Sequence, residues 1–492
     1  MRSMLLSVGL AVGPALGVCQ QPVPATLSLP DAIALARAHN PIYRQALNDR
    51  HPAAWAARNA DASLLIPTLT ASGGVGYAGP GQQNFLTSSF SQSVATWSTN
   101  YALQLEWLLN GQTLTQPGLK KAQLNAADAD VAGAETGLVT AVTQQYLTAL
   151  QARDNAAVAR RQLDVNDESL KLAQARYDVG RASLIDVRQA QVARGQAEVA
   201  LLQAQTAIQV EKLRLFQQMG VTAPVDLGTV QLTDTFSVQA PPWQLTELLA
   251  LAAQQNPALK ALRERERAAG WGVRAAVASY GPSLAVAAGW SGFTQKLSDL
   301  NPSLSAIDLN AAANDSSCKY ANTSWLNAGQ PALDCALYTS TATAQKQALI
   351  AQNNAYPFHF TPQPFQARLT ITLPLWSNFQ QPLQVSQAKA QDEDLQESVR
   401  ARALQIQTDV NQAYLTLAAA YRTIAIQDTN RTAGREQLQL ATERYRVGSG
   451  TFVDLLQAQV QALRAETDYV NAVYDYHKAV AALEAAVGRP LR

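Results

Sequence analysis

The chain has 492 residues, a formal net charge of +1 at pH 7, and only 15% charged residues. This balance excludes the basic excess that nucleic-acid binding usually requires, so no nucleic-acid partner is expected. Alanine, glutamine and leucine dominate most of the length. Such a composition favours long helices or coiled coils.

Residues 1–18 are predicted to be a secretory signal peptide. They contain one basic residue early, a short apolar run and small residues near a cleavage point, and the run is too short to cross a bilayer as a helix. Cys19 follows Leu16-Gly17-Val18, which is similar to the lipobox of bacterial lipoproteins, so Cys19 is a candidate for lipidation. Val18 departs from the usual small residue, and cleavage elsewhere with an unacylated Cys19 is the alternative.

The remaining chain contains two similar halves. An Asn-Pro pair occurs at Asn40 and again at Asn256, 216 residues later. The phrase Tyr-x-Val-Gly-x5-Asp begins at Tyr177 and again at Tyr445, 268 residues later. Only two long repeats are present, which indicates a duplicated unit rather than a solenoid.

We predict repeat 1 at residues 27–220 and repeat 2 at residues 243–488, joined by a linker or equatorial segment at residues 221–242. Each repeat starts with helices around its Asn-Pro pair, because proline is permissible at an early helical position. Each helical region then ends near a proline, after which the periodicity changes to two.

Alternation of apolar with small or polar residues predicts two strands in each repeat. They span about residues 68–78, 97–109, 283–293 and 364–375. The pattern fits a sheet with one apolar face, and it equally fits membrane-barrel strands with lipid outside and water inside. Four strands do not close a barrel, so they form either a small soluble sheet or part of a barrel pooled from several chains, with twelve strands from three.

The second repeat carries 52 additional residues between its landmarks, and we expect a long surface loop over about residues 294–363. Cys318 and Cys335 lie in this insertion. In an oxidising compartment we expect them to form a disulfide, which for a loop of this size stabilises by about 3 kcal/mol. Two free exposed thiols are the alternative.

After its strands, each repeat is predicted to form a long helical hairpin, over about residues 112–219 and 380–487. A first arm of about 65 residues spans on the order of 100 Å. The second return helix has apolar positions at alternating spacings of four and three residues, which indicates coiled-coil packing. These positions are Leu456, Val460, Leu463, Thr467, Val470 and Tyr474.

The repeated phrase lies at the turn of each hairpin. Gly180 and Gly448 fit the left-handed position that ends a helix. A Ser-x-x-Asp and a Thr-x-x-Asp sequence follow, ending at Asp186 and Asp454, and resemble capping boxes. These carboxylates are therefore expected to cap helices. If several chains surround one axis, the same carboxylates form rings that attract cations.

This duplicated order of elements resembles the TolC-type outer-membrane efflux proteins, over about residues 27–488. The resemblance implies a mainly α fold with a membrane β-barrel, in which three chains form twelve strands and a periplasmic α-helical tunnel. It implies that the protein lies in the outer membrane of a Gram-negative-type bacterium and extends into the periplasm. The insertion is then extracellular.

The resemblance implies that the chain is the exit duct of a tripartite efflux or type I secretion system. Such a duct conducts substrates passively to the exterior and has its gate at the periplasmic helical tips. The implied partners are two further copies in a homotrimer, a periplasmic adaptor protein, an inner-membrane pump of the RND, MFS or ABC type, and outer-membrane lipid.

The resemblance also assigns roles at the tips. Tyr445 and Asp454 match the family's second-half tyrosine and first acidic ring position, and Asp186 matches the first-half acidic position. Tyr177, Gly180 and Gly448 complete the predicted gate region.

Two positions depart from the family pattern. Gln457 stands where the best-known members have a second acidic residue, and Gly450 stands where they have a gate-bridging arginine. The hypothesis that follows is a weaker closed-state network, or one built from Arg446 or Arg181.

No enzyme activity, metal or cofactor is expected. The four histidines lack metal-ligand spacing, and the sequence offers neither a nucleophile motif nor a phosphate-binding loop. The alternative to a duct is a periplasmic coiled-coil adaptor or structural protein without channel activity, which leaves the four strands without a role.

Overall fold

The protein is represented by a computed structural model that describes residues 25–85, 88–92, 94–361 and 364–491. The predicted signal peptide and Cys19 lie outside these residues. Two compact units are present. The helical unit comprises Met1–Ala57, Gly118–Trp271 and Gln387–Arg492, and the sheet unit comprises Arg58–Pro117 and Gly272–Ser386.

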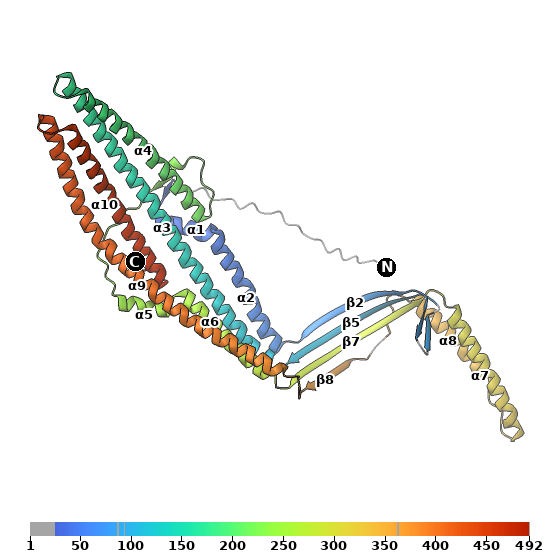
Figure 1. Ribbon diagram of the computed structural model, residues 1–492. Coiled ribbons are helices and arrows are strands. Elements are labelled where there is room, and N and C mark those ends of the chain that lie inside the picture. Colours follow the sequence, from blue (N-terminus) through green and yellow to red (C-terminus); the bar gives the residue numbers. More distant parts are fainter. Residues whose placement is uncertain (1–24, 86–87, 93, 362–363, 492) are drawn as a thin grey trace. The chain divides into compact units, whose positions relative to one another are not determined.

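The main helices occur in equivalent pairs along the two halves of the chain (Figure 1). The pairs are α1 (Leu29–His39) with α5 (Leu245–Gln255), α2 (Pro41–Leu65) with α6 (Pro257–Ala278), α3 (Gly111–Asp178) with α9 (Gln380–Val447), and α4 (Leu184–Met219) with α10 (Phe452–Val487). Both long arms have 68 residues and both return arms have 36. No described helix is both long enough and apolar enough to cross a membrane.

Each repeat is closed by its Asn-Pro pair. Asn40 ends α1 in an extended conformation, as a residue before proline prefers, and α2 begins at Pro41. The Asn40 side chain donates to the carbonyl oxygen of Gln218 at 2.7 Å, in the last turn of α4. Asn256 donates likewise to Ala486 at 3.1 Å, in the last turn of α10.

Glycine is required where these contacts form. Gly220 and Gly488 follow the return helices with φ of +73° and +89°. A Cβ on Gly220 would lie 2.6 Å from the His39 carbonyl oxygen, and one on Gly488 would lie 2.9 Å from the Asn256 Cα. The close approach and the left-handed backbone therefore both exclude other side chains.

The predicted linker packs into the core of the helical unit. It contains a short 3-10 helix η1 (Leu227–Thr229) and strand β6 (Gln231–Leu232), which pairs in parallel with β1 (Thr26–Leu27). Tyr146 on α3 is fully buried, and its hydroxyl donates to the Leu27 carbonyl oxygen at 2.9 Å. One buried hydroxyl therefore joins the long helix to the start of the first repeat.

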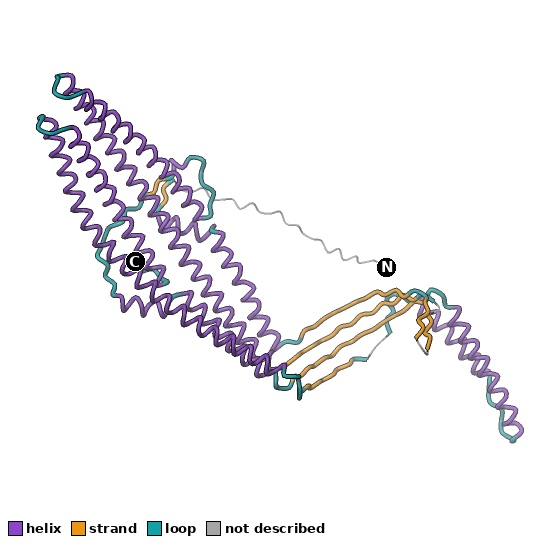
Figure 2. The backbone as a smooth tube through the Cα atoms, viewed as in Figure 1, coloured by secondary structure: helices purple, strands orange, loops and turns teal. Residues whose placement is uncertain are grey.

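The sheet unit contains four antiparallel strands in the order β2-β5-β7-β8, shown in orange in Figure 2. Their bounds are Thr68–Ala78, Thr96–Leu109, Ser283–Leu297 and Gln366–Thr372. β2 has its predicted bounds, β5 begins one residue earlier than predicted, and β7 extends four residues beyond the prediction. β8 is shorter than predicted because Pro364 and Pro374 flank it, and proline donates no ladder hydrogen bond.

The register assigns opposite characters to the two faces of this sheet. Paired residues share a face, and one face gathers aliphatic and aromatic side chains. They are Leu69, Val75 and Tyr77 of β2, Trp97, Tyr101, Leu103, Leu105 and Trp107 of β5, Leu284, Val286 and Trp290 of β7, and Leu369 and Ile371 of β8. The other face carries mainly serine, threonine, asparagine, glutamine, glycine and alanine.

The loop expected over residues 294–363 is largely helical. It contains α7 (Asn301–Asn327) and α8 (Ala336–Asn354), which pack against each other, and Cys318 and Cys335 form the disulfide that joins them. Polar residues surround the helical seam of Leu304, Ile307 and Ala311, so the sequence signal for α7 is weak. Between β2 and β5 the chain forms a smaller hairpin of β3 (Gly81–Phe85) and β4 (Ser88–Gln92).

Replacing Tyr146 with Phe should destabilise the helical unit by about 1–3 kcal/mol, because the buried Leu27 carbonyl oxygen loses its donor. Tyr414 occupies the equivalent position on α9 and provides the matched control: Tyr414→Phe should change stability little, since its hydroxyl makes no hydrogen bond to the described residues. Thermal unfolding of the purified protein in detergent, followed by circular dichroism, measures both. Equal losses in the two variants would contradict the proposed role of the Tyr146 hydroxyl.

Candidate functional site at the helical tips

The first hairpin reverses over five residues between α3 and α4. Gly180 has φ of +70° and donates its N–H to the Tyr177 carbonyl oxygen at 2.9 Å. Ser183 then begins α4 with a capping box: its hydroxyl accepts the Asp186 N–H at 3.2 Å, and Asp186 accepts the Ser183 N–H at 3.3 Å. The glycine ends one helix and the carboxylate starts the next.

The second hairpin reverses in the same way between α9 and α10. Gly448 has φ of +87°, and its N–H donates to the Arg444 carbonyl oxygen at 3.1 Å. Thr451 accepts the Asp454 N–H at 3.1 Å, and Asp454 accepts the Thr451 N–H at 3.1 Å. Both reversals lie at one end of the helical unit (Figure 1).

Asp454 acts as a helix cap in this geometry. Hydrogen bonds from the Thr451 side chain and backbone hold the pKa of Asp454 below its ordinary value of 3.8. The carboxylate is therefore charged at physiological pH, and it is exposed to solvent. It caps α10 and at the same time presents a negative charge at the tip.

The two tyrosines of the repeated phrase have different environments. Tyr177 is 40% exposed, whereas Tyr445 is only 2% exposed. The Tyr445 ring lies 5.3 Å from Phe452 and belongs to a buried cluster that includes Ala173 and Val187 from the first hairpin. Burial raises the pKa of Tyr445, and the Asp186 charge adds to this. Tyr445 therefore joins the two tips, and its sequence equivalent does not.

Arg176 provides the polar contact between the tips. Its guanidinium donates to the Tyr445 carbonyl oxygen and lies 4.4 Å from the centre of the Tyr445 ring. It also donates to the Arg181 carbonyl oxygen at 3.1 Å. The sequence reasoning missed Arg176, although an arginine precedes the tyrosine in both repeats, at Arg176 and at Arg444.

The two positions that depart from the family pattern, and the two arginines suggested in their place, make different contacts on the tips. Arg446 pairs with Glu443 on its own helix at 3.6 Å. Arg181 contributes its backbone carbonyl oxygen to Arg176. Gln457 and Gly450 line a cleft of about 480 Å³ on the second hairpin, together with Arg444, Glu436 and Asp454.

Polar contacts continue between α3 and α10 away from the tip. Gln459 donates to the Ser169 hydroxyl at 2.5 Å, and both side chains are buried. Further along, the Tyr474 hydroxyl donates to Asp154 at 2.5 Å, and Gln151 donates to Asn471 at 2.7 Å. The two hairpins are thus joined by hydrogen bonds at separated levels.

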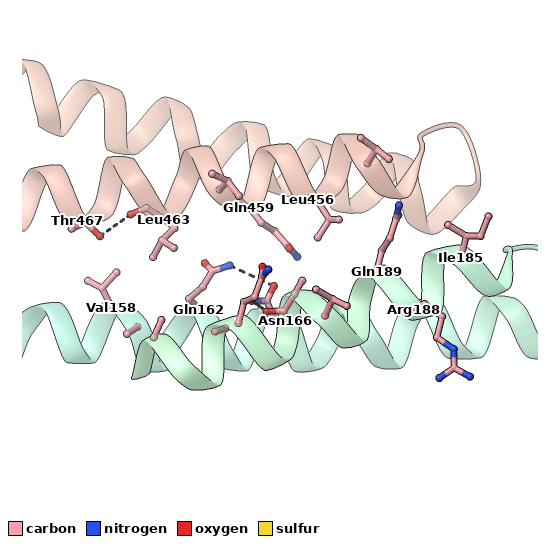
Figure 3. Close-up of a pocket in the computed structure, with 18 of the residues that line it drawn as sticks. Val158, Gln162, Asn166, Ile185, Arg188, Gln189, Leu456, Gln459, Leu463 and Thr467 are labelled. Atoms are coloured by element: carbon pink, nitrogen blue, oxygen red, sulfur yellow. Dashed lines mark hydrogen bonds between the residues drawn. The ribbon is translucent and has the colours of Figure 1, made fainter. Parts of the chain in front are cut away.

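Between these contacts, α3, α4 and α10 line a groove of about 1040 Å³ (Figure 3). Leu456 and Leu463 project into it from α10, and Val158 faces them from α3. The sequence predicts coiled-coil packing for the apolar seam of α10, but Val460 in that seam is exposed on the groove. At Val460 the seam therefore lies open on the groove and is not buried by packing within the chain.

The comparisons with known proteins agree with this architecture. The model of the outer membrane efflux protein family matches residues 32–221 and 248–489, which include both hairpins and all four strands of the sheet. The chain therefore belongs to the outer membrane efflux protein family. It is an outer-membrane efflux channel that reaches into the periplasm; proteins of this family work with adaptor and pump partners, and they are channels rather than enzymes.

Individual relatives are distant in sequence. The outer membrane efflux protein BepC of Brucella suis biovar 1 (strain 1330) is 23% identical over 378 residues, which are 77% of this chain and 69% of BepC. The outer-membrane channel OprN superposes with a TM-score of 0.69 at 17% identity, covering 94% of this chain and 90% of OprN. The outer membrane protein VceC from Vibrio cholerae superposes with a TM-score of 0.69 at 18% identity, covering 94% of this chain and 97% of VceC. These structures share the fold.

Acidification should loosen the first turn of α10. Because the pKa of Asp454 is lowered in the folded protein, its contribution is present above pH 3.8 and is lost as pH falls through the folded pKa. Hydrogen-exchange protection factors of the amides at residues 452–455, measured between pH 6 and pH 3, should fall at the acidic end. Asp454→Asn should lower protection at every pH and remove this dependence, and parallel curves for the two proteins would contradict the assignment.

Proposed function

We propose that this protein is the passive exit duct of a tripartite efflux or type I secretion system, and that it works as a homotrimer. The observation that carries the proposal is the exposed apolar face of the sheet. Leu69 and Val75 of β2 and Leu369 and Ile371 of β8 are 64–71% exposed on this face, at its two edge strands. Contact of such an apolar face with lipid is energetically favourable, whereas its exposure to water is unfavourable.

Aromatic side chains at both ends of this face support a membrane position. The rings of Tyr77 and Trp97 lie 4.8 Å apart at one end of the sheet. The rings of Trp290 and Phe365 lie 4.8 Å apart where β8 begins, at the level of Leu103 in β5. Trp107 lies toward the other end of β5. Aromatic girdles of this kind mark the two interfaces of a bilayer.

The sheet edges favour assembly. β2 and β8 are the two edge strands, and an open edge is not tolerated in lipid. The strands alternate in direction, so β8 of one copy is antiparallel to β2 of the next and can continue the ladder. Three copies supply twelve strands, the number that the family resemblance implies.

In this arrangement the hairpins of three copies form the periplasmic tunnel, and the tips form its gate. Arg176 and Tyr445 hold the two tips of one chain together, while Asp186 and Asp454 add negative charge around the mouth. The α7–α8 hairpin is then extracellular and Cys19, if acylated, anchors the periplasmic side. A periplasmic adaptor and an inner-membrane pump of the RND, MFS or ABC type dock at the tips.

A periplasmic adaptor or structural rod is the competing function. It accounts for the hairpins but leaves an exposed apolar sheet face in water. It predicts a protein that is extracted without detergent and does not conduct ions.

The purified full-length protein should migrate as an SDS-resistant trimer, co-fractionate with outer membranes and form ion-conducting pores in planar bilayers. Heating should convert the trimer band to monomer and abolish conductance together. The control is Leu369→Lys with Ile371→Lys, which places charge on the lipid-facing side and should prevent outer-membrane insertion. A soluble, non-conducting monomer would defeat the duct function.

On the proposal that the Arg176 contact belongs to the closed state and breaks on opening, replacing Arg176 with Ala should shift the gate toward the open state. A hydrogen bond from a charged group contributes about 1.5–3 kcal/mol, so the closed-to-open ratio should fall about tenfold or more. The matched control is Arg181→Ala, since Arg181 contributes only its backbone carbonyl oxygen to this contact. Single-channel recordings give the open fraction, and equal open fractions for both variants and the wild type would reject the Arg176 contact as a gate element.

A further inference from the structure

The polar face of the sheet carries two charged residues in one cross-strand row. Thr68 pairs with Glu106, Glu106 with Ala287, and Ala287 with Arg368. Directly paired residues of an antiparallel sheet project from the same face. Glu106 and Arg368 therefore lie on the same side of the sheet, separated by one strand that carries only a methyl group at that level.

These two side chains are the only charges on this face among the described residues of β2, β5, β7 and β8. Both are exposed. The third charged strand residue, Lys296, pairs with Trp97 and so belongs to the apolar face, at its aromatic end. Lys296 therefore belongs to the same sheet as Glu106 and Arg368 but lies on its other face.

We propose that Glu106 and Arg368 form a belt of alternating charges inside the barrel and set the ion preference of its lumen. The inference rests on the proposed trimer. Glu106 is on β5 and Arg368 on β8, two strands apart within one chain. From β8, the next chain contributes β2 and then β5, so its Glu106 is again two strands away. Around twelve strands the charges alternate at even spacing by strand count.

The spacing allows the charges to act on permeating ions and on each other. Adjacent strands are about 4.8 Å apart, so Glu106 and Arg368 of one chain are about 10 Å apart at the backbone. This is close to the Debye length at 0.1 M salt, about 10 Å. The six charges cancel at long range, while each remains unscreened for an ion or zwitterion passing close to the wall. A solute carrying both signs of charge fits this belt best.

Neutralising one of the two charges should leave the other uncompensated, so that it sets the ion preference. Glu106→Gln leaves three arginines in the trimer and should shift permeability toward anions, and Arg368→Gln leaves three glutamates and should shift it toward cations. Each shift should be on the order of twofold at 0.1 M salt and larger at lower salt. The double variant should return toward the wild-type ratio.

The measurement is the reversal potential of the full-length trimer in a planar bilayer under a KCl gradient. Charges at the tips contribute equally to every variant, so differences from the wild type report the belt. Lys296→Gln is the matched control, because it removes a charge from the opposite face and should leave the reversal potential unchanged. Each variant is first confirmed as an SDS-resistant trimer.

Absence of conductance in the wild type would refute the proposed duct, and with it the belt. Conducting trimers in which Glu106→Gln and Arg368→Gln leave the reversal potential unchanged, or move it in the same direction, would overturn the belt alone. If Glu106→Gln does not assemble, Arg368→Gln decides by itself: a cation shift supports the belt, and no shift or an anion shift rejects it.

Discussion

Each half of the chain depends on the contact between an asparagine and the end of a return helix. Asn40 and Asn256 donate hydrogen bonds to the last turns of α4 and α10. Only glycine fits at positions 220 and 488, where the backbone approaches these Asn-Pro segments. Because this contact fixes where each return helix ends, the lengths of the arms determine where the chain reverses. Equal arms in both halves then bring the two reversals to one end of the helical unit.

The duplication produces equivalent backbones but unequal side-chain roles. Both reversals use a left-handed glycine and a capping aspartate, since any helical hairpin must satisfy the same unpaired N–H and C=O groups. Tertiary contacts have no such constraint. Of the two tyrosines, Tyr445 is buried between the hairpins and Tyr177 is exposed, and Arg176 reaches across to Tyr445. A local motif therefore persists in both copies, while the contact between the tips is made once.

The same distinction explains what the sequence could predict. The strands, the hairpins and the capping residues follow from periodicity and short-range hydrogen bonding, which are readable along the chain. The Arg176 contact was not predictable, because it joins residues 269 positions apart through a backbone carbonyl oxygen that no side-chain pattern marks. The helices of the insertion are not predictable from the sequence, because a two-helix hairpin with small, polar residues buries too little apolar surface to show a strong amphipathic signal.

The sheet is the part of the chain least able to exist alone. Its apolar face requires lipid or another protein surface, and its two edge strands require further strands, so neither demand is met within one copy. Closing the edges with identical copies meets both demands and also decides what the polar face becomes. In the proposed trimer that face encloses water, and the two charges that β5 and β8 place there line the path of the permeating solute. In this proposal, an ordinary alternation of side chains becomes the wall of a channel only on assembly.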